Sequence, residues 1–571
     1  MLRSLIFFSW RYIRTRIRVF FKGMYHYSYY PRPIFEKYQL IESINNLNPE
    51  IWNFIDVKLS DHPDEIKINC AGKIINIEQL PLFWQKVSIG DVDPEVLNSS
   101  HRFHWLLEKL NQGVNHNQII KMVDMIIEWN NQFNSQNYGP AWQPYNVSER
   151  ICNWIVFWQL TTKKNIPLKN DFFTKTLQTH AVFLSNNLEY PASDIVNNHL
   201  LNNARALYIS GRFLNNKSIS NLGIEIFKFH LPEMVGKGGY LKESSSHYQL
   251  LITRSVLEVQ KVALESNDEE FASWLKINSE KMLAACQNLL PLNLKSIIDM
   301  PRIGDISPDM PFNWFSPINK FNAGWNNLWK IPVEDQIFKN DLNDGWVNIG
   351  NKSWFAIVFS HSHSDSLIYP SGHGHDDFGS FCLYLSGLPV IVDVGQLNYK
   401  FSSKSQKKGA TAEMHNTVLI DNKSLLPLNG RFFNNVKAFR KAACNKVDDQ
   451  LIEWSLVSRS GSFWSRKLSI SSLDEVILKD SYINAKVSKG SFNFSPQARV
   501  KIQAKNQIAV SIGDTNLIIK LDGVDKIWIE KSTFYNHYGV PVRSKKLNWT
   551  IYMDNNLSET TISFLKNSNI S

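Results

Sequence analysis

The hydrophobic period of the chain changes near residue 340, and this change divides it into two regions of different fold class. Before it, long segments carry apolar residues three or four positions apart. In "HNQIIKMVDMIIEWNNQF" these residues are Ile119, Met122, Val123, Ile126 and Ile127. Such spacing predicts amphipathic helices. Because no strand-like runs lie between these segments, the first region is predicted to be an all-α domain of paired helices joined by short loops.

A second helix is predicted at "SERICNWIVFWQL", where Trp154 and Trp158 lie on one apolar face. Ser148 or Asn146 is the expected N-cap, because short polar side chains accept hydrogen bonds from the first free backbone N–H groups. Further helices are expected near residues 174–187, 197–213, 218–232, 243–265 and 268–290.

After residue 340 the apolar residues alternate with polar ones. The short, β-branched and aromatic segments are "WFAIVFS", "PVIVDVG", "TVLIDN", "LIEWSLVS", "FWSRKLSI", "EVILKDSYIN", "QIAVSI", "NLIIKLDG", "KIWIEK" and "NWTIYMD". Short strands at regular spacing are typical of an antiparallel β-sandwich.

The length of the chain requires more than one domain. At 571 residues it exceeds what a single hydrophobic core usually supports. The predicted division is a basic leading segment over 1–40, a helical domain over 41–335 and a β domain over 336–571. The stretch 291–340, which is rich in Pro, Trp and Asn, is the expected connection.

The net charge of +10 is concentrated at the start of the chain. Residues 1–30 contain six basic residues and no acid, so the other residues carry only +4. A mildly basic body suits an anionic substrate, and no nucleic-acid motif is present, so no nucleic-acid partner is expected. Residues 1–22 could form a basic amphipathic helix in peripheral contact with a membrane. An ordinary solvated leading helix is the alternative.

No standard export signal is predicted, because the apolar run "LIFFSW" is soon interrupted by arginines. No run of roughly 20 apolar residues predicts a transmembrane helix. These features favour a cytoplasmic or membrane-peripheral location.

The cysteines are widely spaced and odd in number, which predicts buried reduced thiols rather than disulfides or a zinc ribbon; they are Cys70, Cys152, Cys286, Cys382 and Cys444.

A group of histidines and an aspartate in the β region suggests a metal site. His373 and His375 are two residues apart, so they share a face if the segment is extended. With Asp393 and His415, each beside a predicted strand, His375 could form a two-histidine, one-carboxylate zinc site. Hydrogen-bonded histidines near a loop are the alternative. The similar "HSHSD" at 361–365 is interpreted as a solvated loop.

Several motifs together resemble one family. "GHGHDDFGSF", "GLPVIVDVG" and "HNTVLID" are similar to the signature of heparinase II/III-like polysaccharide lyases. Upstream, "WQPYNVSERICNWI", "NNHLLNNARALYISGRFL" and "GKGGYLKESSSHYQLLITRSVLE" resemble, in the same order, the helical domain of these enzymes, so the resemblance covers about residues 100–425. It implies an incomplete (α/α) toroid, alginate lyase-like, followed by an antiparallel β-sandwich, with polysaccharide bound in the cleft between them. It also makes the periplasm an alternative location.

The resemblance implies a lyase that cleaves a uronic-acid-containing anionic polysaccharide by β-elimination. Tyr248 matches the family's catalytic tyrosine, acting as base, acid or both, and His373 its second active-site histidine. Asn198 and His199 match the positions that contact the substrate carboxylate. From the residues alone, packing in a core is the preferred interpretation of Tyr248, and Asn198 could cap a helix.

Three further residues are expected to bind the sugar. Arg150 is a candidate for sugar or carboxylate binding, with a structural ion pair as the alternative. Trp142 and Tyr145 are expected to line the cleft or to pack the toroid.

The cofactor that the resemblance implies is a structural zinc ion held by His375, Asp393 and His415, which leaves His373 free for catalysis. No organic cofactor is expected.

Two departures from the family bear on substrate choice. The loop at 400–417 carries lysines where relatives often have arginine, and Asn202 and Asn203 stand where many relatives have an acid after the histidine.

A role in editing a bacterial surface polysaccharide is an option beside degradation. The competing hypotheses are a catalytically silent carbohydrate-binding or assembly factor and a glycoside hydrolase. The hydrolase would need paired carboxylates, and the sequence does not pair Glu243 with Asp377.

Overall fold

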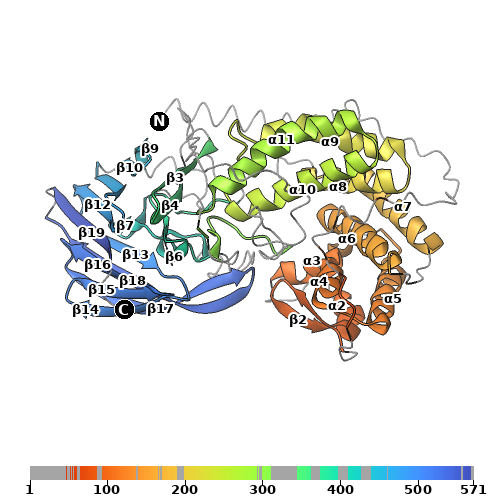
Figure 1. Ribbon diagram of the computed structural model, residues 1–571, viewed down its shortest axis with the longest axis horizontal. Helices are drawn as coiled ribbons and strands as arrows, with labels where there is room; N and C mark the ends of the chain where they lie inside the picture. Colours follow the sequence, from red (N-terminus) through yellow and green to blue (C-terminus); the bar gives the residue numbers. More distant parts are fainter. Residues whose placement is uncertain are drawn as a thin grey trace. The chain divides into compact units, whose positions relative to one another are not determined.

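The computed structural model of the chain contains two compact units (Figure 1). Unit 1 consists of Met1–Val235, Leu251–Glu280 and Pro308–Ile331, and unit 2 of Gly236–Leu250, Lys281–Ser307 and Pro332–Ser571. The structure describes residues 47, 52, 55, 57–60, 65–85, 93–136, 139–164, 166, 170–189, 198–291, 293–294, 299–309, 344–361, 373–395, 409–425, 439–458, 461–554 and 557–567. The predicted basic segment 1–40, with its expected membrane contact, lies outside them.

Unit 1 is built mainly of helices, as the spacing of apolar residues before residue 340 predicts. They are α2 (Leu80–Trp84), α3 (Pro94–Arg102), α4 (His104–Gln112), α5 (His116–Gln132), α6 (Pro144–Thr162), α7 (Asn170–Asn186), α8 (Asn198–Phe213), α9 (Lys217–Met234), α10 (Ser246–Glu265) and α11 (Glu269–Asn288). The first residues of α10 and the last of α11 belong to unit 2. Unit 1 also contains a hairpin that was not predicted from the sequence, β1 (Lys67–Cys70) with β2 (Lys73–Asn76).

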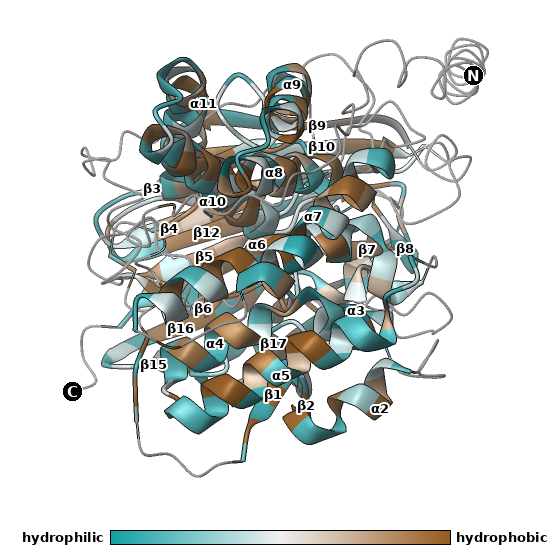
Figure 2. Cartoon of the chain, turned by 90° about the vertical axis from the view of Figure 1, so that its right-hand side faces the viewer, coloured by the Kyte–Doolittle hydropathy of each residue, from teal (hydrophilic) through white to brown (hydrophobic). Residues whose placement is uncertain are grey.

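The predicted apolar face of α5 is largely confirmed, and Figure 2 shows apolar and polar residues on the same helix. Ile119, Met122 and Ile126 are buried. A capping box starts the helix: the Asn115 side chain accepts from the N–H of Gln118, whose own side chain accepts from the N–H of Asn115.

Helix α6 begins earlier than predicted. Its N-cap is Gln143 and Pro144 follows at the first helical position, where proline needs no N–H partner. The prediction of Ser148 or Asn146 as N-cap is therefore wrong. Both residues are within the helical span, and their side chains make other hydrogen bonds. Ser148 Oγ donates to the Pro144 carbonyl, and Asn146 Oδ1 accepts from Arg102 Nε at 2.7 Å.

Helices α8 and α9 form a closely packed pair. A Cβ atom on Gly211 would lie 2.4 Å from the backbone nitrogen of Ser220, and one on Gly223 would lie 2.8 Å from the carbonyl oxygen of Ala204. Glycine at these positions lets the two backbones approach, and α8 also packs on α6. This is the pairing of neighbouring helices that the toroid expectation requires.

Among its described residues, unit 2 contains three antiparallel sheets. The strand order β3-β4-β5-β6 makes a four-stranded sheet, β17-β18-β13-β7-β8 a five-stranded sheet, and β14-β15-β16-β19-β12-β11-β10-β9 an eight-stranded sheet. The strands are β3 (Trp346–Gly350), β4 (Trp354–Phe359), β5 (Cys382–Leu385), β6 (Leu388–Ile391), β7 (Val418–Ile420), β8 (Lys423–Ser424), β9 (Phe439–Asp448), β10 (Leu451–Ser458), β11 (Phe463–Ile470), β12 (Glu475–Ile483), β13 (Val487–Asn493), β14 (Arg499–Ala504), β15 (Gln507–Ile512), β16 (Thr515–Asp522), β17 (Lys526–His537), β18 (Val540–Tyr552) and β19 (Ser558–Lys566).

One hydrophobic core joins the sheets of unit 2. It includes Trp354 of the four-stranded sheet, Trp549 of the five-stranded sheet and Trp464 of the eight-stranded sheet, each almost fully buried. The alternating burial along β10 and β11 follows the predicted period of two. The toroid-plus-sandwich prediction is thus confirmed for the fold class.

Two smaller observations complete the fold. All five cysteines are buried thiols that form no disulfide, as predicted. Among the helices that the structure describes, none is long and apolar enough to cross a membrane.

Candidate active site and metal centre

Three segments that are distant in sequence meet in unit 2: residues 243–248, 303–307 and 373–377. The backbone N–H of Asp305 donates to the carbonyl of His373 at 3.1 Å, and the N–H of Ser246 donates to that of Ile303 at 3.0 Å. Ser245 Oγ donates to the carbonyl of Asp305 at 2.7 Å. These bonds fix the first turn of α10 against the loop that carries the two neighbouring histidines.

Gly304 allows this close approach. Its φ of +75° lies in the left-handed region that favours glycine. A Cβ atom there would lie 2.4 Å from the Ser244 carbonyl oxygen and 2.8 Å from that of His373. No larger residue fits without moving one of the three segments.

Tyr248 and His373 lie against each other. Their rings stack with centroids 3.8 Å apart and planes 16° apart. Tyr248 is on the first turn of α10, where its backbone N–H donates to Ser245 Oγ at 3.1 Å, and it is 6% exposed. The structure therefore brings together two of the four residues predicted to be catalytic, which are 125 residues apart in the sequence.

Two carboxylates flank the His373 ring. Nδ1 donates to Asp305 Oδ2 at 3.0 Å, and Nε2 lies 3.7 Å from Glu243 Oε2. Burial alone would lower the pKa of His373, but the Asp305 hydrogen bond and the Glu243 charge outweigh it and raise the pKa above its ordinary value. Burial would raise the pKa of Asp305, yet the hydrogen bonds from His373 and His375 lower it to about 2.

Asp305 was not among the residues predicted from the sequence, and Glu243 had no predicted partner. Each lies in a loop or at a helix start, where no periodic pattern points to it. The one local signal for Asp305 is the Gly-Asp pair in "PRIGDISPD", which contains the glycine of the close approach.

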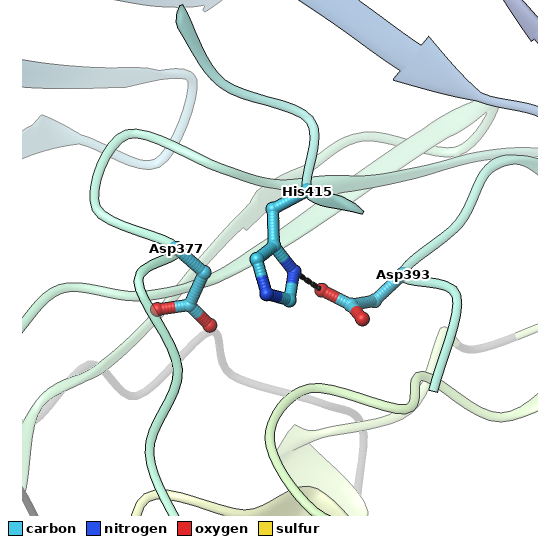
Figure 3. Close-up of side chains that lie close together, drawn as sticks. All are labelled: Asp377, Asp393 and His415. Atoms are coloured by element: carbon cyan, nitrogen blue, oxygen red, sulfur yellow. Dashed lines mark hydrogen bonds and ion pairs between the residues drawn. The ribbon is translucent and has the colours of Figure 1, made fainter. Parts of the chain in front are cut away.

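A second cluster contains the predicted metal ligands. His415 Nδ1 donates to Asp393 Oδ2 at 2.8 Å. Asp377, Asp393 and His415 each offer one ligand atom within 4.8 Å of the others, and Figure 3 shows the His415 ring between the two carboxylates. The structure therefore places Asp377 in this group beside two of the predicted ligands. The third, His375, has its ring centroid 5.2 Å from that of His415, and its Nε2 donates to Asp305 Oδ1 at 2.8 Å.

The chemistry of these residues fits a metal ion. Both histidines are buried, and within the described part of the chain His375 Nδ1 and His415 Nε2 have no hydrogen-bond partner. An unsatisfied buried nitrogen costs free energy, whereas a metal bond would satisfy it. Burial would lower the pKa of His415, but the charge and hydrogen bond of Asp393 outweigh it and raise the pKa to about 9. His375, His415 and one of the carboxylates give the nitrogen and oxygen donors that zinc prefers.

The interpretation of "HSHSD" as a solvated loop is wrong for His361. This residue is 2% exposed, and its Nε2 donates to Asp377. Phe359, whose ring contacts His361, is only two residues away, but the acceptor Asp377 lies 16 residues further along the chain, where the local motif does not point to it. His363 and Asp365 of the same motif lie outside the described residues.

The loops of the metal cluster are held by two buried side chains. Asn416 Nδ2 donates to the carbonyls of Phe381 and Val392, both at 2.9 Å, and so ties the His415 segment to the chain before Asp393. Arg466 donates to the carbonyl of Asn416 at 3.1 Å.

The other predicted catalytic residues, Asn198 and His199, belong to unit 1 and begin α8. The His199 ring lies 4.5 Å from that of Tyr145, and its Nδ1 is 3.1 Å from Glu189 Oε1. Glu189 Oε2 also accepts from Asn203 Nδ2 at 3.2 Å. A carboxylate thus lies beside His199 although this chain has asparagines where many relatives have an acid.

The predicted sugar-binding residues are more buried than expected. Arg150 is fully buried, with its guanidinium 3.9 Å from the Trp129 ring and donating to the carbonyls of His101 and Ala141. Trp142 is 2% exposed, and its Nε1 donates to the Phe133 carbonyl. These contacts are those of core residues. The alternative ion pair for Arg150 is absent from the contacts that the described residues make.

Tyr145 takes part in a different network of unit 1. Its hydroxyl donates to Asp309 Oδ2 at 2.6 Å, and Asp309 Oδ1 accepts from Arg102 Nη1 at 2.5 Å. Burial would raise the pKa of Asp309, but the Arg102 charge and the Tyr145 hydrogen bond lower it below its ordinary value. Tyr145 therefore has a fixed orientation and presents its ring to His199.

Comparison with known proteins agrees with this fold. Residues 89–309 match the family model "Heparinase II/III N-terminus", and residues 340–564 match "Heparinase II/III-like, C-terminal". The two matches are in the order that the family has and cover both halves of the chain. No match was found among curated proteins.

Three solved structures are similar over nearly the whole chain. A heparinase III has 16% identity and a TM-score of 0.65, with 95% of this chain and 88% of that one covered. A second heparinase III gene product has 15% identity and a TM-score of 0.61, covering 93% and 87%. A mutant heparan sulfate lyase from Pedobacter heparinus has 15% identity and a TM-score of 0.57, covering 97% and 89%. At this identity the likeness establishes the fold.

Proposed function

This chain belongs to the heparinase II/III-like family and is a polysaccharide lyase, and we propose that it cleaves a uronic-acid-containing anionic polysaccharide by β-elimination. Structural neighbours that are named heparinase III and heparan sulfate lyase make a glycosaminoglycan the first polymer to test. The observation that carries the proposal is the pair of Tyr248 and His373, two groups able to transfer protons, stacked in a buried site with carboxylates at the histidine.

Elimination needs two proton transfers at one glycosidic linkage. A base removes the proton from C5 of the uronate, the electron pair forms the C4–C5 double bond, and the C4–O bond breaks. The departing oxygen keeps the bonding electrons and takes a proton from an acid. Positioned side chains contribute roughly 10²- to 10⁴-fold each to such steps.

Tyr248 and His373 supply groups for these two roles. The phenol of Tyr248 can release and accept a proton at its oxygen. His373 carries a proton on Nδ1 toward Asp305, while Nε2 lies on the Glu243 side. Since the carboxylates raise the pKa of His373, the ring can hold a second proton, either to donate it or to offset the charge of the substrate.

Asn198 and His199 are proposed to bind the substrate carboxylate. A backbone nitrogen at the start of α8 favours an anion nearby, because the N-terminal end of a helix carries partial positive charge. The side chain of His199 is 38% exposed, so it is accessible to a ligand. Tyr145, held by Asp309, would support its ring.

A zinc ion would be held by His375 and His415 with Asp393, as the resemblance implies, and Asp377 offers a further oxygen in the same group. Such an ion would supply structural cross-linking of the two loops rather than a step of the elimination. The metal and its ligands are part of the proposal.

The first experiment follows ultraviolet absorbance while the purified protein is incubated with heparan sulfate, alginate and other anionic polysaccharides. Elimination leaves a C4–C5 double bond conjugated to the carboxylate, so absorbance rises. New reducing ends without absorbance would identify a hydrolase. Binding of a polymer without either product would favour the silent carbohydrate-binding factor.

The second experiment replaces Tyr248 by Phe. We expect turnover to fall at least about 100-fold with folding and polymer binding unchanged, because only the phenol hydroxyl is lost. Tyr384→Phe is the matched control: Tyr384 is buried in the same unit, and its hydroxyl donates to the Asp299 carbonyl. Retained activity in Tyr248→Phe would remove its assigned role.

A further inference from the structure

Asp305 contacts two histidines with one carboxylate. Its Oδ2 accepts from His373 Nδ1 at 3.0 Å, and its Oδ1 accepts from His375 Nε2 at 2.8 Å. The residue is 7% exposed. One of these histidines stacks on Tyr248, and the other has its ring 5.2 Å from that of His415. Asp305 is therefore the side chain that touches both the proposed catalytic group and the proposed metal site.

An ionised carboxylate can only accept hydrogen bonds, so both of these nitrogens must carry a proton. The proton on His375 Nε2 leaves Nδ1 with its lone pair, and Nδ1 is the buried atom that has no partner among the described residues. The proton on His373 Nδ1 leaves Nε2 on the side of Glu243. We propose that Asp305 is a positioning residue that fixes the ring orientation of both histidines, presenting Nδ1 of His375 to a metal ion and holding Nε2 of His373 on the Glu243 side of the proposed active site.

The backbone around Asp305 gives it the rigidity that this role needs. Its N–H donates to the His373 carbonyl, and its own carbonyl accepts from Ser245 Oγ. Gly304 brings it within contact distance of both neighbouring segments. Since a main-chain hydrogen bond joins Asp305 to His373, and Ser245 holds its carbonyl from the other side, these contacts restrict movement of the carboxylate relative to the two rings.

The inference rests on the proposed function for His373, but its His375 half does not need a substrate. In Asp305→Asn one amide oxygen can still accept, while the amide NH₂ can only donate. One histidine must therefore lose its acceptor or change its tautomer. Groups that orient a metal-bound histidine typically contribute about 10- to 100-fold to metal affinity.

The deciding experiment measures zinc affinity by competition with a chromogenic chelator and the visible spectrum of the cobalt(II)-loaded protein. We expect Asp305→Asn to bind zinc about 10- to 100-fold more weakly and to change the cobalt spectrum. Asp299→Asn is the matched control, because Asp299 is a buried carboxylate of the same segment whose partner is Gln497 Nε2. It should leave both readouts unchanged. Thermal unfolding checks that each variant is folded.

Asp305→Glu separates position from charge. It keeps two acceptor oxygens but moves them by one methylene, so a positioning role predicts weaker zinc binding here as well. Wild-type behaviour of Asp305→Glu beside a weakened Asp305→Asn would overturn the proposal in favour of charge alone. Unchanged zinc affinity in Asp305→Asn, or no divalent metal bound by the wild type, would also overturn it.

Once a cleaved polymer is known, Asp305→Asn should lower kcat with little change in KM, because the substrate contacts stay in place. If the wild-type protein cleaves no polymer, the proposed lyase chemistry fails, whereas the metal measurements still decide the role of Asp305 toward His375.

Discussion

The buried ion pair of Arg466 and Asp480 should be a main determinant of the stability of unit 2. The two residues face each other across β11 and β12, with Nε and Nη2 donating to the two carboxylate oxygens, both at 2.8 Å. Arg466 is 0% and Asp480 1% exposed. Nη1 also donates to the carbonyls of Gly379 and Asn416, at 2.7 and 3.1 Å. The pair therefore links the eight-stranded sheet to both loops of the metal cluster.

Asp480→Asn would leave the Arg466 guanidinium buried without an opposite charge. Removing one partner of a buried pair costs about 3–5 kcal/mol in the free energy of unfolding. Since each kcal/mol lowers the midpoint of a domain of roughly 150–250 residues by about 2–4 °C, the Tm of unit 2 should fall by roughly 6–20 °C. The double variant Arg466→Met/Asp480→Leu removes both charges, so it should be less destabilised than the sum of the two single variants.

Thermal and urea unfolding, followed by tryptophan fluorescence, measures these effects. The matched control is the neighbouring exposed pair of Lys467 and Glu453, whose charged atoms are 2.6 Å apart on the adjacent strands β11 and β10. Glu453→Gln should cost no more than about 1 kcal/mol, because water screens a surface pair. Equal, small shifts for Asp480→Asn and Glu453→Gln would refute the reasoning, and so would additivity in the double variant.

Three further predictions concern the site and its surroundings. His375→Ala should lower metal content and Tm more than His373→Ala does, as elemental analysis and thermal unfolding would show; equal metal loss would mean that their roles are wrongly divided. Burial lowers the pKa of His537 to about 4 from an ordinary 6.5, so the unfolded chain binds the proton first and stability falls as the pH drops from 6.5 toward 4. In His537→Gln this decrease, at most about 3 kcal/mol, should disappear from urea midpoints measured across that range. Gly304→Ala should prevent normal folding or metal binding. In the control Gly461→Ala, at φ +89° with no atom within 4 Å of the added Cβ, the free energy of unfolding should fall by only about 1 kcal/mol. Equally small decreases of Tm in both variants would contradict the close approach at Gly304.

Local alternation of apolar and polar residues predicted several of the strands, although β4, which was also predicted, is buried along its whole length. In β10 and β11 every second residue is buried, so the pattern itself carries the information. Strand β13, "VSKGSFN", lacks that pattern and was missed. It lies between β18 and β7, and its Gly490 leaves room for the Trp549 ring, whose Cζ2 would be 2.1 Å from an added Cβ. Its burial depends on partners from distant parts of the chain.

The candidate site was predictable only where its residues are close in sequence or match a family motif. The spacing of His373 and His375 pointed to one site, and the resemblance added Tyr248. Asp305 lies 68 residues before His373 in an irregular segment, and Glu243 precedes a helix. Their proximity to His373 depends on how three distant segments pack together. The spacing of apolar residues within one segment does not predict which other segments it contacts.

Charge balance connects the two parts of the site. Five carboxylates, each under 10% exposed, lie near four histidines in unit 2, and buried charges are stable only when they are compensated. The carboxylates are Glu243, Asp305, Asp376, Asp377 and Asp393. They raise the pKa of His373 above its ordinary value and that of His415 to about 9. A divalent cation bound by His375 and a neutral His415 would offset two of the negative charges, and a protonated His373 a third. The buried carboxylates therefore require positive charge at the metal cluster, which a cation or a protonated His415 supplies.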